Sequence, residues 1–278
     1  MILNYRLLWK ELVLFSSAQL IGAFSALKLA PLIDNYGMAV EFNFSWPDLV
    51  FLFIFIIILF FLFSRFSWIA NSIVRFFLIL AVFSGSQFIF YSFLPKNLVM
   101  LSTLVLVVLF IFWRKVMVHN IAMIFGIAGI GAVFGLNITP IQAIIILSVL
   151  SFYDIIAVYW TKHMVKMAEG MIKTKNIFGL IIPEKSGDFI SPIDKAQPGQ
   201  GFMILGSGDI IMPLILSSSV IISSFLSSLI IIGFSVAGMF LTHILFVNQN
   251  VRRPMAALPP IAAMSILGYL LTVFLNIV

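Results

Sequence analysis

Long apolar stretches follow one another along almost the whole chain, and they constrain its fold more than any other feature. A helix of about 20 apolar residues, with a range of about 17–25, crosses the hydrocarbon core of a bilayer. Such stretches lie at roughly 9–31, 48–64, 71–93, 97–113, 119–137, 140–162, 201–222, 225–247 and 256–277. Within a bilayer, a helix satisfies its own backbone hydrogen-bonding groups. The sequence therefore predicts an all-α polytopic membrane protein with nine transmembrane helices.

Composition supports a single membrane domain over residues 1–278, with helices one to six at about 9–162, a loop at about 163–200 and helices seven to nine at about 201–277. Hydrophobic residues make up 62% of the chain and charged residues 9%, against about 25% charged residues in soluble domains. The absence of cysteine excludes disulfides, thiolate metal sites and a cysteine nucleophile. The net charge of +6 indicates basic loops on one membrane face, not nucleic-acid binding. The N-terminus runs directly into the first apolar stretch without a cleavage-site pattern, which favours a retained helix.

Basic residues divide unequally between the two faces that nine spans would create. The face of the N-terminus and of the even-numbered loops receives Arg6, Lys10, Arg65, Arg75, Arg114, Lys115, six lysines between 162 and 195, Arg252 and Arg253. The opposite face receives only Lys28 and Lys96. The positive-inside rule therefore predicts a cytoplasmic N-terminus and a C-terminus outside. Glu11 and Lys28 lie near the ends of the first span, where we expect them to snorkel towards water.

Two aspartates lie deep in predicted spans, at Asp154 and Asp209. A charge in such a position costs roughly 2.5–3.5 kcal/mol, so it indicates a functional site. Each lies eight residues from the loop at 163–200, so both are predicted about 12 Å from the same membrane face. Two adjacent carboxylates in a poor dielectric share one proton. One can then activate water while the other donates to a carbonyl oxygen, which hydrolyses an amide without a covalent intermediate.

Three short motifs around these residues resemble one family. They are Tyr153-Asp154, Gly206-Ser207-Gly208-Asp209 and Ala256-Ala257-Leu258-Pro259. Together they resemble the presenilin and signal peptide peptidase intramembrane aspartyl proteases. The third motif departs from the family's Pro-Ala-Leu because alanine replaces its proline at 256. The resemblance implies nine spans in the presenilin orientation, catalysis by Asp154 and Asp209, and a microbial homologue in the cell membrane.

The resemblance also implies roles for the remaining motif residues. Tyr153 would orient or cover the two aspartates, unless it is a packing residue. Gly206 and Gly208 would allow a substrate backbone or helix six to come close. Ser207 stands where many members carry a bulkier apolar residue, so we expect it to affect substrate preference. Ala256, Ala257, Leu258 and Pro259 would hold the site and contact the substrate.

The predicted substrates are transmembrane or signal-peptide helices, and membrane lipid is the surrounding partner. The protein would act alone or as a homo-oligomer. No His-Glu-x-x-His pattern is present, and neither a metal nor an organic cofactor is implied. His119 and His243 lie near span ends, where histidines are ordinary. A proton- or cation-coupled transporter or channel using the same aspartates is the alternative function.

Two further patterns predict local structure. The loop begins with an amphipathic stretch, His163 to Lys175, which predicts a helix at the membrane surface. The apolar run 177–182, closed by Pro183, predicts an exposed strand that could pair with an unwound substrate; a hydrophobic anchor is the alternative. Gly131 and Gly135 have the GxxxG spacing, which predicts close helix packing.

Overall fold

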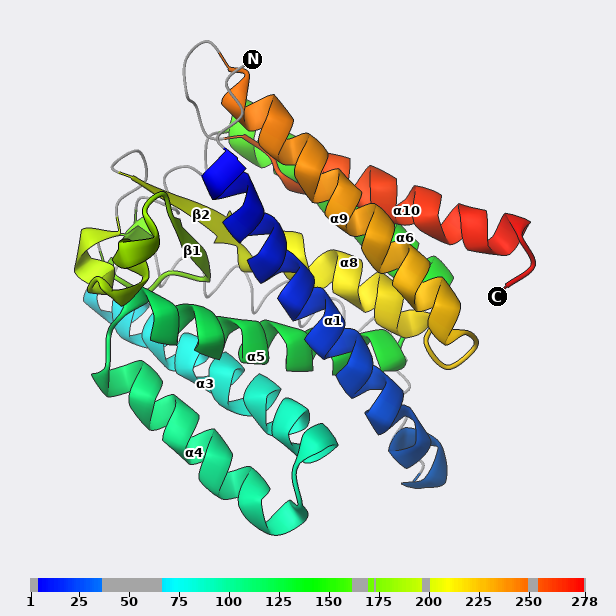
Figure 1. Ribbon diagram of the computed structural model, residues 1–278, viewed down its shortest axis with the longest axis horizontal. Coiled ribbons are helices and arrows are strands. Elements are labelled where there is room, and N and C mark those ends of the chain that lie inside the picture. Colours follow the sequence, from blue (N-terminus) through cyan, green and yellow to red (C-terminus); the bar gives the residue numbers. More distant parts are fainter. Residues whose placement is uncertain are drawn as a thin grey trace.

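The computed structural model describes residues 5–36, 67–161, 170–172, 174–196, 201–249 and 255–277. The predicted span at 48–64 lies outside these residues. The helices are α1 (Tyr5–Tyr36), α3 (Ser67–Phe93), α4 (Lys96–Phe112), α5 (Val116–Leu136), α6 (Pro140–Ile155), α8 (Ser207–Ser219), α9 (Phe225–Val247) and α10 (Leu258–Phe274). A two-stranded sheet, β1 (Gly179–Pro183) and β2 (Phe202–Gly206), lies at one end of the helix bundle (Figure 1).

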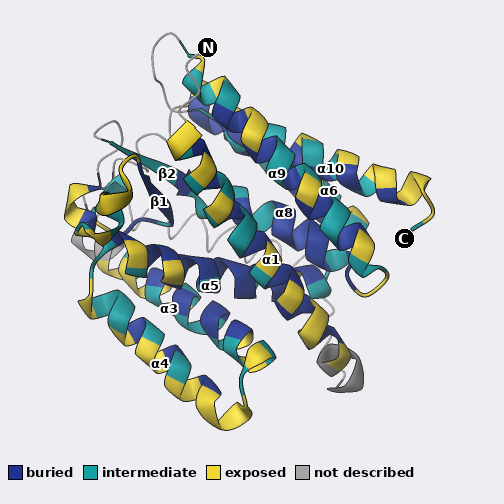
Figure 2. Ribbon diagram, viewed as in Figure 1, coloured by how far each residue is buried: buried dark blue, intermediate teal, exposed yellow. Residues whose placement is uncertain are grey.

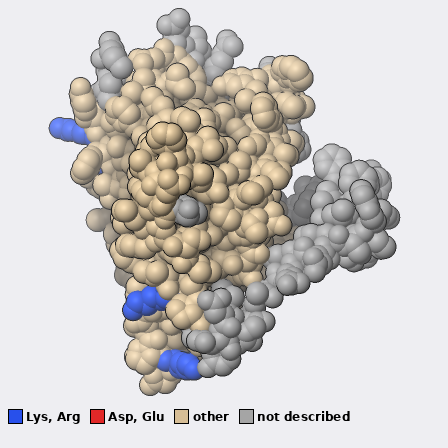
Figure 3. All heavy atoms as spheres, turned by 90° about the vertical axis from the view of Figure 1, so that its right-hand side faces the viewer, with Lys and Arg blue, Asp and Glu red and all other residues tan. Residues whose placement is uncertain are grey.

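The helices have the length and apolarity expected of a polytopic membrane protein. Within the described part of the chain, five are long and apolar enough to cross a membrane: Tyr5–Pro31, Ser72–Phe93, Val116–Leu136, Pro140–Trp160 and Phe225–Val247. The helices Lys96–Phe112 and Leu258–Phe274 are apolar but shorter. Figure 3 shows one face of the molecule that is almost entirely uncharged, with Lys and Arg only near its margin. The predicted polytopic helical fold is confirmed.

Helix starts follow from local chemistry. Thr139 caps α6 by accepting from the Gln142 amide, while the Gln142 side chain accepts from the Thr139 N–H, which is a complete capping box. Ser224 caps α9 with a single bond, because its side chain accepts from the Ser227 N–H. Prolines occupy the first turn of both α6 and α10, where the missing N–H costs nothing.

Helix α5 is the buried centre of the bundle, and Figure 2 shows it mostly in the buried colour. Its glycines permit close backbone approach on two sides. A Cβ at Gly129 would collide with the carbonyl oxygen of Gly85 on α3, and one at Gly135 would collide with Ser218 and Ile215 on α8. A Cβ at Gly131 would meet the side chain of Leu214. The close packing predicted for the GxxxG spacing is therefore confirmed, and its partner is α8.

The predicted span at 201–222 is wrong at both ends. Residues Phe202–Gly206 form β2, and α8 covers only Ser207–Ser219. Gly201, at φ 82°, turns the chain before β2. Hydropathy does not separate the two elements, because a buried strand and a buried helix are equally apolar. The nearby β1 supplies the hydrogen bonds that make the strand possible.

The predicted strand at 177–182 is confirmed as β1, but the prediction that it is exposed is wrong. Every residue of β1 is buried, and it pairs antiparallel with β2 in the register Gly179 to Gly206 and Pro183 to Phe202. Residues 170–172 and 174 are helical, in agreement with the end of the predicted amphipathic helix. The start of that helix, at 163–169, lies outside the described residues.

Candidate active site

Asp154 lies in the last turn of α6 and is 6% exposed. Its Oδ2 accepts a hydrogen bond from the backbone N–H of Leu258, 3.3 Å away. Leu258 is the first residue of α10, and the next two positions, Pro259 and Pro260, have no N–H to offer. The Leu258 N–H is thus the only backbone donor among the first three α10 positions, and Asp154 accepts from it. This end of a helix also favours negative charge.

Asp209 lies in the first turn of α8, three residues after the N-cap Gly206. Its carboxylate accepts from the Gly206 backbone, which is the reach-back half of a capping box. A Cβ at Gly206 would lie 3.0 Å from Oδ2 of Asp209. Gly206 therefore makes room for the carboxylate of Asp209 itself. The close approach of a substrate backbone or helix six at this glycine stays a prediction. Gly208, by contrast, has open space where a Cβ would be.

The fold brings the two aspartates together from α6 and α8, which pack against each other and against α10. Asp154 lies within electrostatic range of Asp209. The predicted position of Asp209, eight residues into a helix, is wrong, because this residue lies in the first turn of α8. Strand β2 takes up the intervening residues. Two neighbouring carboxylates, each bonded to a backbone N–H, can share a proton and act on a water molecule.

The C-terminal motif lies directly against this pair. Ala256 and Leu258 are buried, and the Leu258 side chain packs in one cluster with Leu147 of α6 and Leu216 of α8. Thr242 of α9 donates to the carbonyl of Ala257, 3.4 Å away. The motif therefore links α9 to the start of α10, where the Leu258 amide meets Asp154. Pro259 is half-buried.

Tyr153 does not share the buried environment of its neighbour. Its side chain is 51% exposed, beside Phe152 at 70%. Tyr153 therefore lies on the outward side of α6. Immediately beyond Asp154, the α-helix changes to a π-helix at Ile156–Trp160, a rare irregularity that is frequent at functional sites.

Ser207 and Gly208 border an apolar cavity between α3, α5 and α8. Its volume is ≈ 140 Å³, and its wall includes Val82, Met123 and Ile127. The Ser207 amide donates to the carbonyl of Phe178, 3.2 Å away, which continues the pairing of the two strands into the first turn of α8. The two residues that directly precede Asp209 in the sequence thus form part of the cavity wall.

The outer edge of β1 is occupied by side chains of α1 and α5. Asn120 donates to the Ile181 carbonyl at 2.7 Å and accepts from its N–H at 2.8 Å. His119 bonds to the Gly179 carbonyl at 3.0 Å, and Lys10 donates to the Pro183 carbonyl at 2.9 Å. These contacts leave no room for a further strand on β1. His119 lies in the first turn of α5, near the span end as predicted, and its side chain is only 3% exposed.

Other buried polar residues have partners that the sequence analysis did not identify. Gln19 of α1 is fully buried and donates to the Ile210 carbonyl, next to Asp209, at 2.7 Å. Glu11 does not snorkel: its Oε2 lies 2.6 Å from Nδ1 of His243, and both side chains are 0% exposed. The sequence does indicate that these residues have partners, because polar residues inside apolar spans need them. The partners lie too far away in sequence to be identified from it.

Comparisons with known proteins agree with this geometry. The family described as "Signal-peptide peptidase, presenilin aspartyl protease" matches residues 17–278. A solved structure of a presenilin family intramembrane aspartate protease, in space group C222, is 23% identical and has a TM-score of 0.56, with 94% of each chain covered. A second, in space group P2, is 25% identical and has a TM-score of 0.56, with 93% of this chain and 96% of that chain covered. The comparison with curated sequences finds no match.

The helical membrane fold, with one aspartate on α6 and one on α8 within electrostatic range of each other, is typical of a polytopic membrane protein of the aspartyl protease class. The chain belongs to the signal peptide peptidase and presenilin family, and it is an intramembrane aspartyl protease. The predicted resemblance and enzyme class are therefore confirmed. Nothing in the comparisons supports the transporter alternative.

Proposed function

We propose that Asp154 and Asp209 form the catalytic pair that hydrolyses a peptide bond of a transmembrane or signal-peptide helix. One carboxylate removes a proton from water, whose oxygen attacks the scissile carbonyl. The other, protonated, donates to that carbonyl oxygen. The tetrahedral adduct then collapses, and the proton passes to the leaving amine. The pair titrates as a unit, so either residue can carry the shared proton.

One observation carries this proposal: two carboxylates from different helices lie within electrostatic range of each other, and each is oriented by a backbone N–H at the start of a helix. A purely structural carboxylate in a membrane would be expected to pair with a basic side chain. Among the described residues, the ion pairs are Glu11 with His243 and Lys175 with Asp194, and neither involves Asp154 or Asp209.

The test is cleavage of a single-pass substrate by the reconstituted protein. Asp154→Asn and Asp209→Asn preserve side-chain shape, and each should lower the rate by about 10²–10⁴-fold. Asp194→Asn is the matched control, because this carboxylate is 52% exposed and lies outside the pair. Cleavage that survives either active-site change, or aspartate-dependent ion flux without cleavage, contradicts the proposal.

We further propose that the unwound substrate pairs with the outer edge of β2. The bonds from Ser207 N–H to Phe178 O, and from Glu184 N–H to Gly201 O, flank the two strands. In an antiparallel pair these bonds alternate, so the backbone groups of Phe202 and Ile204 point away from β1. No other strand covers this edge among the described residues. A substrate strand there would run alongside β2 towards Asp209.

A proline substitution at Ile204 distinguishes substrate docking on β2 from formation of the sheet itself. Ile204→Pro removes an outward N–H and should leave the pairing with β1 intact, since proline is tolerated on edge strands. Leu205→Pro removes an N–H that faces β1 and should destabilise the sheet itself. We expect Ile204→Pro to lose cleavage while its thermal stability stays near that of the wild type. Full cleavage by this variant would exclude docking at β2.

The cavity beside Ser207 suggests which side chain the substrate presents. An apolar cavity of about 150 Å³ is large enough to hold benzene, so ≈ 140 Å³ suits a leucine- or phenylalanine-sized group. Ser207→Leu should fill this space and shift preference towards substrates with small residues near the cleaved bond. Ser207→Ala leaves the cavity open and serves as the control. Equal preferences in Ser207→Leu and the wild type would contradict this assignment.

We also propose that the N-terminus is cytoplasmic and the C-terminus outside, as the basic residues of the even-numbered loops suggest. The chain has no cysteine, so single cysteines can be labelled without background. In intact cells an impermeant maleimide should label Asn276→Cys, beyond α10, and should not label Asn248→Cys, between α9 and α10. The reverse pattern would invert the orientation.

A further inference from the structure

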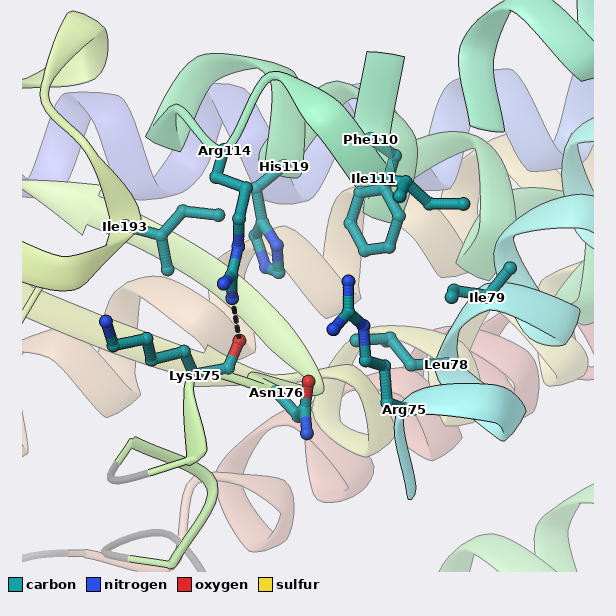
Figure 4. Close-up of a pocket in the computed structure, with 10 residues that line it drawn as sticks. All are labelled: Arg75, Leu78, Ile79, Phe110, Ile111, Arg114, His119, Lys175, Asn176 and Ile193. Atoms are coloured by element: carbon teal, nitrogen blue, oxygen red, sulfur yellow. Dashed lines mark hydrogen bonds between the residues drawn. The ribbon is translucent and has the colours of Figure 1, made fainter. Parts of the chain in front are cut away.

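A basic pocket lies where α3, α4 and α5 meet the segment that leads into β1. We call it the interfacial pocket; its polar wall consists of Arg75, Arg114, His119, Lys175 and Asn176. Figure 4 shows the guanidinium groups of Arg75 and Arg114 directed towards the same space. The lining contains no aspartate or glutamate.

Most polar side chains that line the pocket already have partners within the protein. Lys175 forms an ion pair with Asp194 at 2.9 Å, and His119 bonds to the Gly179 carbonyl. Arg114 donates to the Lys175 carbonyl at 3.2 Å, a neutral acceptor that leaves its charge uncompensated. Neither arginine has a carboxylate partner among the described residues. Two positive charges therefore face one small space without a matching anion.

The surroundings of the pocket have the features of a membrane interface. Helix α4 ends at Phe112 and α5 begins at Val116, so Arg114 lies in the turn between two apolar helices. Large aromatic side chains are exposed around it: Phe76, Phe77, Phe112 and Trp113. Aromatic residues in such positions mark the head-group region of a bilayer. Further along α4, Leu101 and Val105 are exposed and suit contact with acyl chains.

We propose that the interfacial pocket binds the phosphate of an anionic phospholipid. Guanidinium groups match phosphate geometry with paired hydrogen bonds, and basic pockets between transmembrane helices bind lipid head groups. Arg75 and Arg114 hold the phosphate from α3 and from the α4–α5 turn, and the acyl chains lie along the exposed apolar side of α4. This binding does not depend on the catalytic proposal.

The bound lipid also supports the sheet beside the active site. Arg114 is bonded to the Lys175 carbonyl, and its own carbonyl accepts from the Ile193 N–H at 3.0 Å. These contacts hold both sides of the segment that contains β1. A phosphate that fixes Arg114 therefore stabilises the folded protein, because any ligand that binds only the folded state does so.

The test uses the full chain in a neutral phosphatidylcholine detergent mixture, with phosphatidylglycerol, phosphatidylcholine or inorganic phosphate added. Thermal unfolding and native mass spectrometry report stabilisation and lipid retention. Phosphatidylglycerol should raise the Tm of the wild type and be retained above phosphatidylcholine. Arg75→Gln should weaken both effects without disturbing the bond from Arg114 to Lys175. Arg75→Gln/Arg114→Gln should reduce lipid affinity by about tenfold or more.

Arg6→Gln is the matched control, because it removes an exposed positive charge on α1 outside the pocket. It should behave as the wild type. An equal Tm rise in the double variant overturns the proposal, and so does an equal loss in Arg6→Gln, which would indicate general charge attraction. A rise with inorganic phosphate alone that matches the effect of lipid would assign the pocket to free phosphate instead.

Discussion

Asn120 is the residue whose substitution tests the structure most directly. Its side chain is 2% exposed, and its amide group binds both the N–H and the carbonyl of Ile181, at 2.8 and 2.7 Å. Asn120→Leu retains most of the volume but leaves two buried backbone groups without partners. At about 1–3 kcal/mol for each group, the loss is about 2–6 kcal/mol. That is a large share of a typical total stability of about 5–15 kcal/mol.

The loss should concentrate on β1, which packs against α5 through this contact. Hydrogen exchange of the Ile181 amide should accelerate, the Tm should fall, and cleavage should fall because β1 supports β2. Asn137→Ala is the matched control: this amide bonds to the Val133 carbonyl of its own helix, partly exposed, and its loss should cost about 0.5–1.5 kcal/mol. If Ile181 stays protected in Asn120→Leu, Asn120 does not hold the sheet and the reasoning fails.

Four other substitutions have clear expected outcomes. Glu11→Leu should destabilise the protein by about 3–5 kcal/mol, because it leaves His243 buried without its partner. Changing both Glu11 and His243 to leucine should recover much of this loss. A double-mutant cycle measured by thermal unfolding tests this, and simple additivity of the two changes would contradict it. Gly129→Ala should cost about 1–3 kcal/mol or more, because the new methyl group meets backbone on α3. Gly233→Ala, with open space around it, should be neutral or stabilising by up to about 1 kcal/mol, and equal melting temperatures for these two variants would refute the packing argument. Gln19→Leu should slow cleavage with little change in Tm, because Gln19 holds the carbonyl next to Asp209; unchanged kcat would remove Gln19 from the site.

Much of the fold could be predicted because its determinants are local. The hydrocarbon thickness sets a span length that any apolar helix must match. Asp154 and Asp209 were identifiable because a carboxylate in an apolar stretch is costly and rarely retained without use. The GxxxG spacing at Gly131 and Gly135 predicted close packing, although not that α8 would be the helix in contact.

The sheet could be predicted only in part. The strand character of 179–183 follows from its residues, but its partner lies in an apolar run that has the hydropathy of a helix. Pairing also decided which edge was free. Asn120, His119 and Lys10 occupy the edge of β1, and nothing near them in sequence indicates that they reach it.

The sequence by itself determined that this chain spans a membrane and that two aspartates need a reason to be there. Both conclusions follow from the cost of exposing polar groups to hydrocarbon, which depends on each residue and its near neighbours. The tertiary structure alone decided which groups meet: Asp154 with the Leu258 amide, Glu11 with His243, and Arg75 with Arg114 around one pocket. Those meetings depend on the packing of distant helices, which no local pattern specifies.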